Sequence, residues 1–355
     1  MTKNRSSGRF FLHISEKSST FAPAKMDDVN QRPIYIVGPC AAESREQVME
    51  TAHACAVRMH DVPFIFRAGV WKPRTSPNTF QGAGDEALRW LQEVKTTYGI
   101  PVATEVATPE HVTKALEAGI DYLWIGARTS ANPIAVQAIA ENLNNPNNPK
   151  GLFIKNPVNA DAKLWLGNIE RIEKAVYGVG CKVYAIHRGC NHQPCWAMAH
   201  EVRISRPDIP MLLDPSHMSG DAAQVPTLME KIAELGLDGA MVEVHTHPES
   251  ALSDMKQQIR PDDLTNLINR NNLNNPNCEL NWLRAEIDEL DEQLWDTIAA
   301  RMEVSKRIGT WKKAHGVAPL QPERAKEIRE RLKAKGEWAL RIWEQIHEES
   351  LKQQL

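Results

Sequence analysis

Short apolar runs alternate with longer amphipathic runs from residue 34 to residue 269, and this alternation restricts the fold more than any other feature. The apolar runs predict eight strands, at 34–37, 64–66, 101–104, 122–125, 152–154, 183–186, 211–213 and 241–244. The amphipathic runs predict helices at 44–59, 84–97, 109–118, 132–142, 161–176, 195–202, 221–234 and 254–269, the last broken at Pro261. Eight such units in about 250 residues predict a closed (β/α)8 TIM barrel. An open doubly wound sheet is the alternative, although no G-x-G-x-x-G follows any expected strand.

Polar and charged residues follow the expected strands, always at the same end. They are Cys40, Arg67 with Lys72 and Arg74, Glu105, Arg128, Lys155, Arg188, Asp214 with His217, and Glu243. The loops that follow the strands carry the chemistry of (β/α)8 barrels. We therefore expect these side chains to converge on one site.

Three of these cations, Arg67, Lys72 and Arg74, lie within eight positions after the second strand. Pro73 cannot continue a helix and disfavours helical backbone at Lys72, so these cations project from a loop. A planar guanidinium beside an ammonium group suits phosphate or carboxylate recognition. Together with the cations after later strands they suffice for two anionic substrates. A basic surface loop in ion pairs with acidic neighbours is the alternative.

A thiol, an imidazole and two carboxylates, at Cys40, His217, Glu243 and Asp254, form a donor set that can hold a divalent transition metal. Such an ion polarises a substrate carbonyl as a Lewis acid. A lone cysteine or histidine more often belongs to the core or the surface, so the prediction rests on the four residues together. Manganese is the expected ion, and iron, cobalt and zinc tolerate the same donors.

Composition and low-complexity stretches indicate the domain boundaries and exclude some partners. A formal net charge of −3 and the lack of a long apolar run predict neither nucleic-acid binding nor a membrane span. Six cysteines without a C-x-x-C pair indicate reduced thiols and a cytoplasmic protein. We expect a flexible extension at 1–33, the barrel at 34–268, an Asn-rich linker at 269–278 and a helical domain at 279–355, with 142–149 as an exposed loop.

The helical domain begins with apolar residues spaced by three or four positions. They are Leu283, Ile287, Leu290, Leu294 and Ile298. This pattern predicts one helix of about 35 residues, and two shorter helices are expected at 322–335 and 338–354. A helix this long cannot be covered by the rest of a small three-helix domain, so we expect a homodimer formed at least through this domain. A coiled-coil appendage without chemistry is the alternative.

A series of short motifs runs through the expected barrel in a fixed order. They read Gly38-Pro39-Cys40, Lys72-Pro73-Arg74-Thr75-Ser76-Pro77, Ala103-Thr104-Glu105, Ile125-Gly126-Ala127-Arg128, Ile154-Lys155-Asn156-Pro157, Ile186-His187-Arg188-Gly189, Asp214-Pro215-Ser216-His217, Met241-Val242-Glu243-Val244-His245 and Ala251-Leu252-Ser253-Asp254. The series resembles 3-deoxy-D-arabino-heptulosonate 7-phosphate (DAHP) synthases of the short subtype related to 3-deoxy-octulosonate 8-phosphate synthase. The resemblance implies condensation of phosphoenolpyruvate with erythrose 4-phosphate, which releases phosphate and opens the shikimate pathway. An octulosonate-type barrel with a dimerising tail is an alternative, although that family has an Ala-Asn insertion beside Pro73.

The resemblance also implies a role for each site residue. The metal ion is bound by Cys40, His217, Glu243 and Asp254 and activates the aldehyde of erythrose 4-phosphate. Phosphoenolpyruvate is held by Arg67, Arg128, Lys155 and Arg188, and erythrose 4-phosphate by Lys72, Pro73, Arg74 and Thr75. Lys72 supplies a proton to the nascent alkoxide, and Glu105 orients or deprotonates the attacking water. A solvated acid is the alternative for Glu105.

The tail carries a second set of motifs. They are Leu283-Arg284, Ile287-Asp288, Leu290-Asp291, Leu294, Arg301, Lys312, Pro322-Glu323-Arg324 and Glu348-Glu349-Ser350 with Gln354. The set resembles the all-helical chorismate mutases, which rearrange chorismate to prephenate in a cation-lined pocket. The resemblance implies that Arg284 and Arg301 bind carboxylates, that Lys312 and Gln354 hold the ether oxygen, and that Arg324 and Ser350 complete the substrate site.

Two points qualify the resemblance of the tail. Arg301 and Lys312 share a helical face, but Arg284 lies seventeen residues before Arg301, about 25 Å along a helix, so we expect Arg284 to serve the site of a partner chain. Ala325 and Gln321 stand where the family usually has acidic residues, one of which contacts the substrate hydroxyl. A catalytically weak domain that binds chorismate or prephenate for feedback is therefore the alternative to an active mutase.

Overall fold

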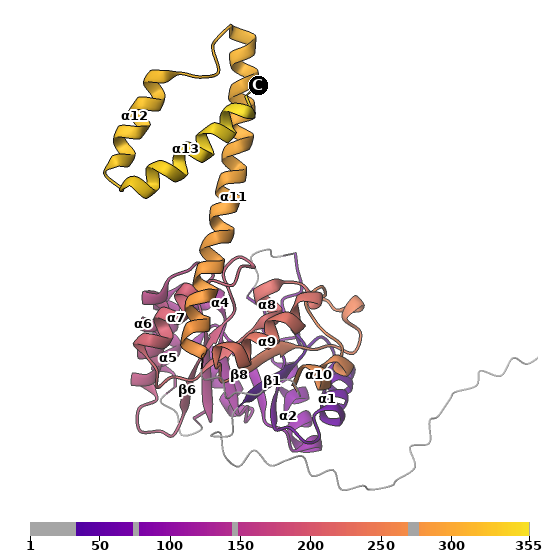
Figure 1. Cartoon of the computed structure of the whole chain (residues 1–355). Helices are drawn as coiled ribbons and strands as arrows, with labels where there is room; N and C mark the ends of the chain where they lie inside the picture. The colour runs from indigo at the N-terminus through magenta and orange to yellow at the C-terminus, as the bar shows by residue number, and fades with distance from the viewer. Residues whose placement is uncertain (1–32, 74–77, 144–147, 269–276, 355) are drawn as a thin grey trace, which may run out of the picture. The chain divides into compact units, whose positions relative to one another are not determined.

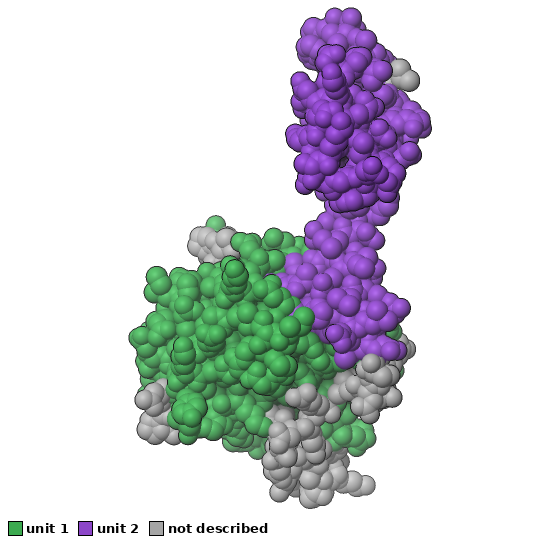
Figure 2. Space-filling view, turned by 60° about the vertical axis from the view of Figure 1, so that its left-hand side comes forward, with its two compact units in different colours: residues 1–193, 201–275 green, residues 194–200, 276–355 purple. Residues whose placement is uncertain are grey.

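The computed structural model describes residues 33–73, 78–143, 148–268 and 277–354. The chain divides into two compact units, which are coloured separately in Figure 2. Unit 1 comprises residues 1–193 and 201–275, and unit 2 comprises 194–200 and 276–355. The extension expected at 1–33 and the linker expected at 269–278 lie almost entirely outside the described residues, as does the centre of the loop at 142–149.

Unit 1 is a closed barrel of parallel strands, as the alternation predicts. The strands are β1 (Ile34–Gly38), β2 (Phe64–Arg67), β3 (Val102–Val106), β4 (Tyr122–Ile125), β5 (Gly151–Lys155), β6 (Lys182–His187), β7 (Met211–Leu213) and β8 (Gly239–Glu243). They pair in sequence order, and β1 pairs with both β2 and β8, which excludes the open sheet. Trp124, Phe153 and Met241 belong to the buried cluster that fills the barrel.

Helices surround these strands, as Figure 1 shows. They are α1 (Arg45–Arg58), α2 (Glu86–Tyr98), α3 (Pro109–Glu117), α4 (Ala127–Ser130), α5 (Pro133–Glu141), α6 (Ala162–Ala175), α7 (Trp196–Ser205), α8 (Pro215–Ser219), α9 (Val225–Leu235) and α10 (Pro261–Ile268), with 3-10 turns η1 (Ala222–Gln224) and η2 (Pro248–Ser250). Side chains of Ser44, Thr108 and Asp161 accept hydrogen bonds from backbone N–H groups at the starts of α1, α3 and α6.

The expected helix at 254–269 is wrong in its first half. The helix begins only at Pro261. Asp254 has a φ of 48°, residues 255–257 form a turn, and Ile259 forms a β-bridge with Val244. Pro261 sits at the first helical position, where its missing N–H is not needed, and it disfavours helical backbone before it. Two very short helices after strands, α4 and α8, have no counterpart in the expected elements. They hold Arg128 and His217.

Unit 2 is all helical among its described residues. It contains α11 (Cys278–His315), α12 (Pro322–Lys333) and α13 (Glu337–Lys352), and α11 is 38 residues long. The segment 194–200 belongs to this unit because Trp196 and His200 pack against Trp282, which is 1% exposed. No described helix combines the length and the apolar character that crossing a membrane requires.

Candidate active site

Three of the four predicted metal ligands lie together at the carboxyl ends of the strands. One donor atom each from Cys40, Glu243 and Asp254 lies within 4.8 Å of the other two. His217 is the next neighbour, with its Nε2 3.6 Å from Glu243 Oε1. Its other ring nitrogen, Nδ1, lies 2.9 Å from Asp214 Oδ2, an arrangement that leaves Nε2 to face the carboxylate cluster.

The surroundings of this cluster fit a cation. Glu243 is fully buried, and its Oε1 makes no hydrogen bond to any described residue, although Arg67 Nη2 lies 3.2 Å away. Burial and the neighbouring Glu243 carboxylate raise the pKa of the Cys40 thiol, whereas Lys72 opposes the shift. A thiol held protonated by burial between carboxylates becomes a good ligand once a bound cation displaces its proton. The donor set is that of a divalent transition metal.

Two glutamines that sequence reasoning missed hold the cluster in place. Gln257 Nε2 donates to Glu243 Oε2 at 2.7 Å. Gln258 Oε1 accepts from the backbone N–H of Cys40 at 3.0 Å, and Gln258 Nε2 donates to the carbonyl of Ser253. Both follow Asp254 in the loop that was expected to be helical, and their position just after a predicted ligand is the only signal that marks them.

Arg67 and Lys72 contact the cluster directly. Arg67 is 1% exposed, and its Nη2 donates to the carbonyl of Cys40 at 3.1 Å while its guanidinium lies 4.7 Å from the Trp124 ring. Lys72 Nζ lies 3.1 Å from the sulfur and 3.2 Å from the carbonyl oxygen of Cys40. Burial alone would lower the pKa of Lys72, but the nearby Glu105 and Glu243 carboxylates help to raise it, so the ammonium keeps its charge.

A cavity of about 530 Å³ opens beside these residues and collects most of the predicted side chains. It is lined by Lys72, Pro73, Glu105, Gly126, Ala127, Arg128, Lys155, Val158, Arg188, Asn191, His192, His217, Asp254 and Gln257. Arg67 is not part of this lining and lies against Cys40 and Glu243 instead. Arg74 and Thr75 lie outside the described residues.

Lys155 and His217 share one buried carboxylate at the rim of the cavity. Lys155 Nζ donates to Asp214 Oδ2 at 2.6 Å, and Asp214 also accepts from the backbone N–H of His217 as the cap of α8. Burial alone would raise the pKa of Asp214, but His217 and Lys155 hold it well below its usual range. Asp214 therefore stays ionised and orients two residues of the site.

We expect Asp214→Asn to destabilise unit 1 by about 3–5 kcal/mol, because it leaves the buried Lys155 ammonium without its carboxylate. Since the pKa of Asp214 is lower in the folded state, its contribution is complete at neutral pH and is lost as pH falls below about 4. Urea unfolding at pH 7 measures the loss. The double variant Lys155→Met/Asp214→Asn, which removes both charges, should recover part of it. A single-variant loss under 1 kcal/mol contradicts the prediction.

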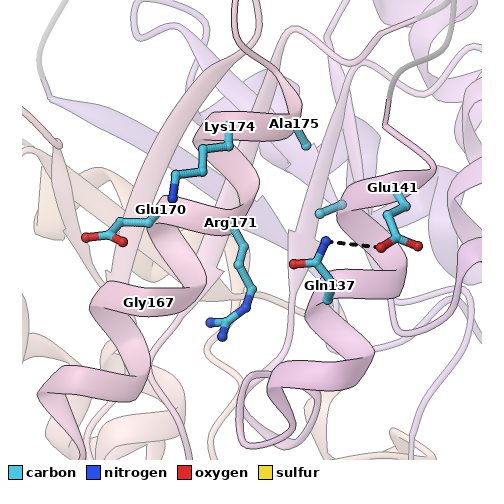
Figure 3. Close-up of a pocket in the computed structure, with 8 residues that line it drawn as sticks. Gln137, Glu141, Gly167, Glu170, Arg171, Lys174 and Ala175 are labelled. Carbon is cyan, nitrogen blue, oxygen red and sulfur yellow. Dashed lines mark hydrogen bonds between the residues drawn. The ribbon is translucent and has the colours of Figure 1, made fainter.

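A larger hollow, of about 670 Å³, lies between α5 and α6 on the outside of unit 1 (Figure 3). Gln137 and Glu141 face it from α5, and Arg171 and Lys174 from α6. No residue predicted from the sequence lines it, and it lies among the outer helices rather than at the strand ends. The smaller cavity beside Cys40 is the one with convergent chemistry.

Unit 2 pairs four of its six predicted site residues. Arg301 of α11 donates to the hydroxyl of Ser350 and to the carbonyl of Ile346 on α13. Lys312 Nζ donates at 3.0 Å to Oε1 of Gln354, which follows just after α13. Ser350 and Gln354 are buried, at 2% and 8% exposure. Gly309 lets the backbone at Gln354 approach α11 closely, because a Cβ at position 309 would lie 2.6 Å from Gln354 Cα. Arg284 and Arg324 are exposed and remain apart from these pairs.

Unit 1 is a (β/α)8 barrel with a cation-lined cavity and a thiol–carboxylate cluster at its strand ends. These features are those of the (β/α)8-barrel enzymes that act on anionic substrates. Residues 24–273 match the DAHP synthetase I family, and 283–355 match chorismate mutase type II. The chain belongs to the DAHP synthetase I family and carries a chorismate mutase type II domain after its barrel.

Relatives and solved structures agree with this assignment. Phospho-2-dehydro-3-deoxyheptonate aldolase of Thermotoga maritima is 34% identical over 230 residues, which are 63% of this chain and 64% of that protein. The 2-dehydro-3-deoxyphosphooctonate aldolase of Desulfatibacillum aliphaticivorans is 30% identical over 250 residues, covering 66% of this chain and 89% of the relative. The crystal structure of the T. maritima protein, described as a DAHP synthase, superposes with a TM-score of 0.59 at 30% identity over 69% of this chain and 71% of that one.

Proposed function

We propose that unit 1 condenses phosphoenolpyruvate with erythrose 4-phosphate to give DAHP and phosphate. The observation that carries the proposal is the cluster of Cys40, Glu243 and Asp254 beside a cavity lined by Lys72, Arg128, Lys155 and Arg188. Cations in such a cavity can neutralise two phosphorylated substrates. The similarity to proteins named for DAHP formation supports this reaction.

A divalent metal held by Cys40, His217, Glu243 and Asp254 would supply Lewis-acid polarisation of the sugar aldehyde. Lys72 touches both Cys40 and the cavity, so it is placed to protonate the oxygen that becomes an alkoxide. Glu105 is 8% exposed and lines the same cavity, where its carboxylate would orient the water that attacks the phosphoenolpyruvate carbon. Arg128, Lys155 and Arg188 would hold the phosphate and carboxylate of phosphoenolpyruvate.

Incubation with phosphoenolpyruvate and either a four-carbon or a five-carbon aldose phosphate tests the reaction. DAHP synthesis predicts that release of phosphate from phosphoenolpyruvate depends on erythrose 4-phosphate. The octulosonate-type alternative requires a five-carbon sugar phosphate instead, because eight product carbons minus the three of phosphoenolpyruvate leave five. Equal turnover of both sugars, or preference for the longer one, rejects the proposal.

We also propose that unit 2 rearranges chorismate to prephenate at Arg301, Lys312, Ser350 and Gln354. Arg301→Ala is expected to lower kcat/KM for chorismate about 10- to 100-fold, because a hydrogen bond from a charged donor contributes about 1.5–3 kcal/mol. Chorismate consumption by the full chain is the measurement, with Arg307→Ala, on the same helix but outside the pairs described, as the control. Tight prephenate binding without turnover would favour the binding-only alternative.

A homodimer is proposed for unit 2 because one face of α11 is apolar and uncovered. Leu283, Ile287, Leu290 and Leu294 are between 48% and 60% exposed and recur every three or four residues. The same helical face holds Arg301 and Lys312 further along, so a second copy seated on it could bring its Arg284 to this site. Leu290→Glu should therefore halve the mass measured by light scattering, whereas Glu292→Lys, about 200° around the helix, should not.

A shared site makes a second measurement possible. Arg284→Ala and Arg301→Ala chains should each have strongly reduced mutase activity, but mixing them after dissociation should restore about one quarter of the native sites. If mixing restores no mutase activity, both arginines belong to a site within one chain.

Prephenate is proposed as a feedback ligand as well as a product. The chain carries both a domain for the first step of the pathway and a domain that acts at its branch point. Binding of prephenate to the helical domain can therefore change the activity of the barrel. Saturating prephenate should lower DAHP synthesis, and Arg301→Ala should weaken that effect.

A further inference from the structure

The face of α13 that carries Ser350 also carries His347, which has no role among the predicted site residues. Residues 347 and 350 are three positions apart, so their side chains lie on one face of the helix, and Gln354 follows just after the helix ends. Ser350 and the carbonyl of Ile346, the residue before His347, both accept from Arg301. His347 therefore lies directly beside the pairs that form the proposed mutase site.

The imidazole of His347 is held in place by an aromatic stack. Its ring stacks on Trp343, with 4.6 Å between centroids and 10° between planes, and the guanidinium of Arg329 lies 5.5 Å from the same tryptophan ring. Among the described residues, no hydrogen-bond partner reaches its Nε2, which is buried. A buried polar atom without a partner costs about 1–3 kcal/mol, so a ligand group that pairs with it gains affinity.

Burial and nearby positive charges keep the ring unprotonated. Burial lowers the pKa of His347, and Arg301, Arg329 and Lys312 lower it further. The imidazole is thus neutral at physiological pH, and a neutral ring nitrogen can donate to or accept from a hydroxyl group. A carboxylate of the ligand would instead bind the charged side chains of Arg301 and Lys312.

Chorismate has one polar group that the four paired residues leave unassigned. Its carboxylates fall to the arginines and its ether oxygen to Lys312 and Gln354, which leaves the ring hydroxyl. Ala325, at the position where an acid is expected from the resemblance, is buried and offers no polar side chain. We infer that His347 is a further substrate-contacting residue of unit 2, whose Nε2 hydrogen-bonds the ring hydroxyl of chorismate. This inference rests on the mutase function proposed above.

Substitution by phenylalanine tests the contact, because His347→Phe keeps an aromatic ring against Trp343 and removes Nε2. We expect it to raise KM for chorismate about 3- to 10-fold, the effect of losing one neutral hydrogen bond, with a melting temperature equal to or above that of the wild type because the unpaired buried atom is gone. A chorismate analogue without the ring hydroxyl should bind the wild type and His347→Phe equally. His315→Phe is the matched control, because His315 also stacks on a tryptophan four residues earlier, at 4.1 Å, but is exposed.

The outcomes separate the contact from the function on which it rests. Suppose that the wild type turns over chorismate or binds prephenate in calorimetry. The contact alone is then overturned if His347→Phe behaves like the wild type, or if it weakens binding of the hydroxylated and the deoxygenated ligand equally. If the wild type neither converts chorismate nor binds prephenate, the proposed function fails, and the contact fails with it.

Discussion

Cys40→Ser is expected to lower DAHP synthesis at least 100-fold, the largest loss that a single substitution in this barrel should give. The Cys40 sulfur lies 3.0 Å from Asp254 Oδ2 and 3.1 Å from Lys72 Nζ. Serine differs from cysteine only by an oxygen in place of the sulfur, so it would occupy nearly the same space. A serine hydroxyl does not ionise under conditions in which a metal ion deprotonates a thiol, and it is a poorer ligand for a transition metal. Removal of metal by a chelator should produce a comparable loss in the wild type.

Cys55→Ser is the matched control for this prediction. Cys55 is fully buried in α1, and burial alone raises the pKa of its thiol to about 12. The control should lose some stability but keep its activity and its sensitivity to chelation. Activity of Cys40→Ser within about threefold of the wild type, together with indifference to chelator, would remove the metal from the proposed reaction.

Gly126→Ala is expected to reduce kcat for DAHP synthesis about 100-fold with little change in stability. A Cβ added at position 126 would lie 2.1 Å from Glu105 Oε1, so the carboxylate must move away from its place in the cavity wall. The φ of Gly126 is −73°, which alanine adopts without strain, so the backbone itself need not change. Misplacement of a group near the reacting atoms by about 1 Å can cost about 100-fold in rate.

Gly167→Ala provides the comparison for Gly126→Ala. Gly167 lies inside α6, and a Cβ there would meet only the flexible end of Arg171 at 3.1 Å. Because alanine favours helix over glycine, this variant should be as stable as the wild type or more stable by up to about 1 kcal/mol, with full activity. Equal kcat in Gly126→Ala and wild type would show that Glu105 has no role in turnover.

The sequence by itself determined the elements and the end of the barrel that carries the chemistry. Strand and helix periods differ, and parallel strands with intervening helices bring the residue after each strand to one rim. The sequence therefore assigns one site to Cys40, Glu105, Arg128, Lys155, Arg188 and Glu243. The 38-residue α11 followed equally from apolar spacing and the lack of an early proline.

Only the tertiary structure decided which of these residues touch and which support them. Gln257 and Gln258 hydrogen-bond to the ligand cluster from a loop that was predicted to be helical. Their partners, Glu243 and Cys40, lie 14 and 218 positions away, and local periodicity indicates neither contact. Arg67 lies against Cys40 and Glu243 rather than in the cavity wall. Ser350, on the same helical face as His347, meets Arg301 only because α13 packs on α11. Local propensities fix periods over a few residues, whereas contacts between residues more than 200 positions apart, such as Cys40 with Asp254, exist only once the barrel has closed.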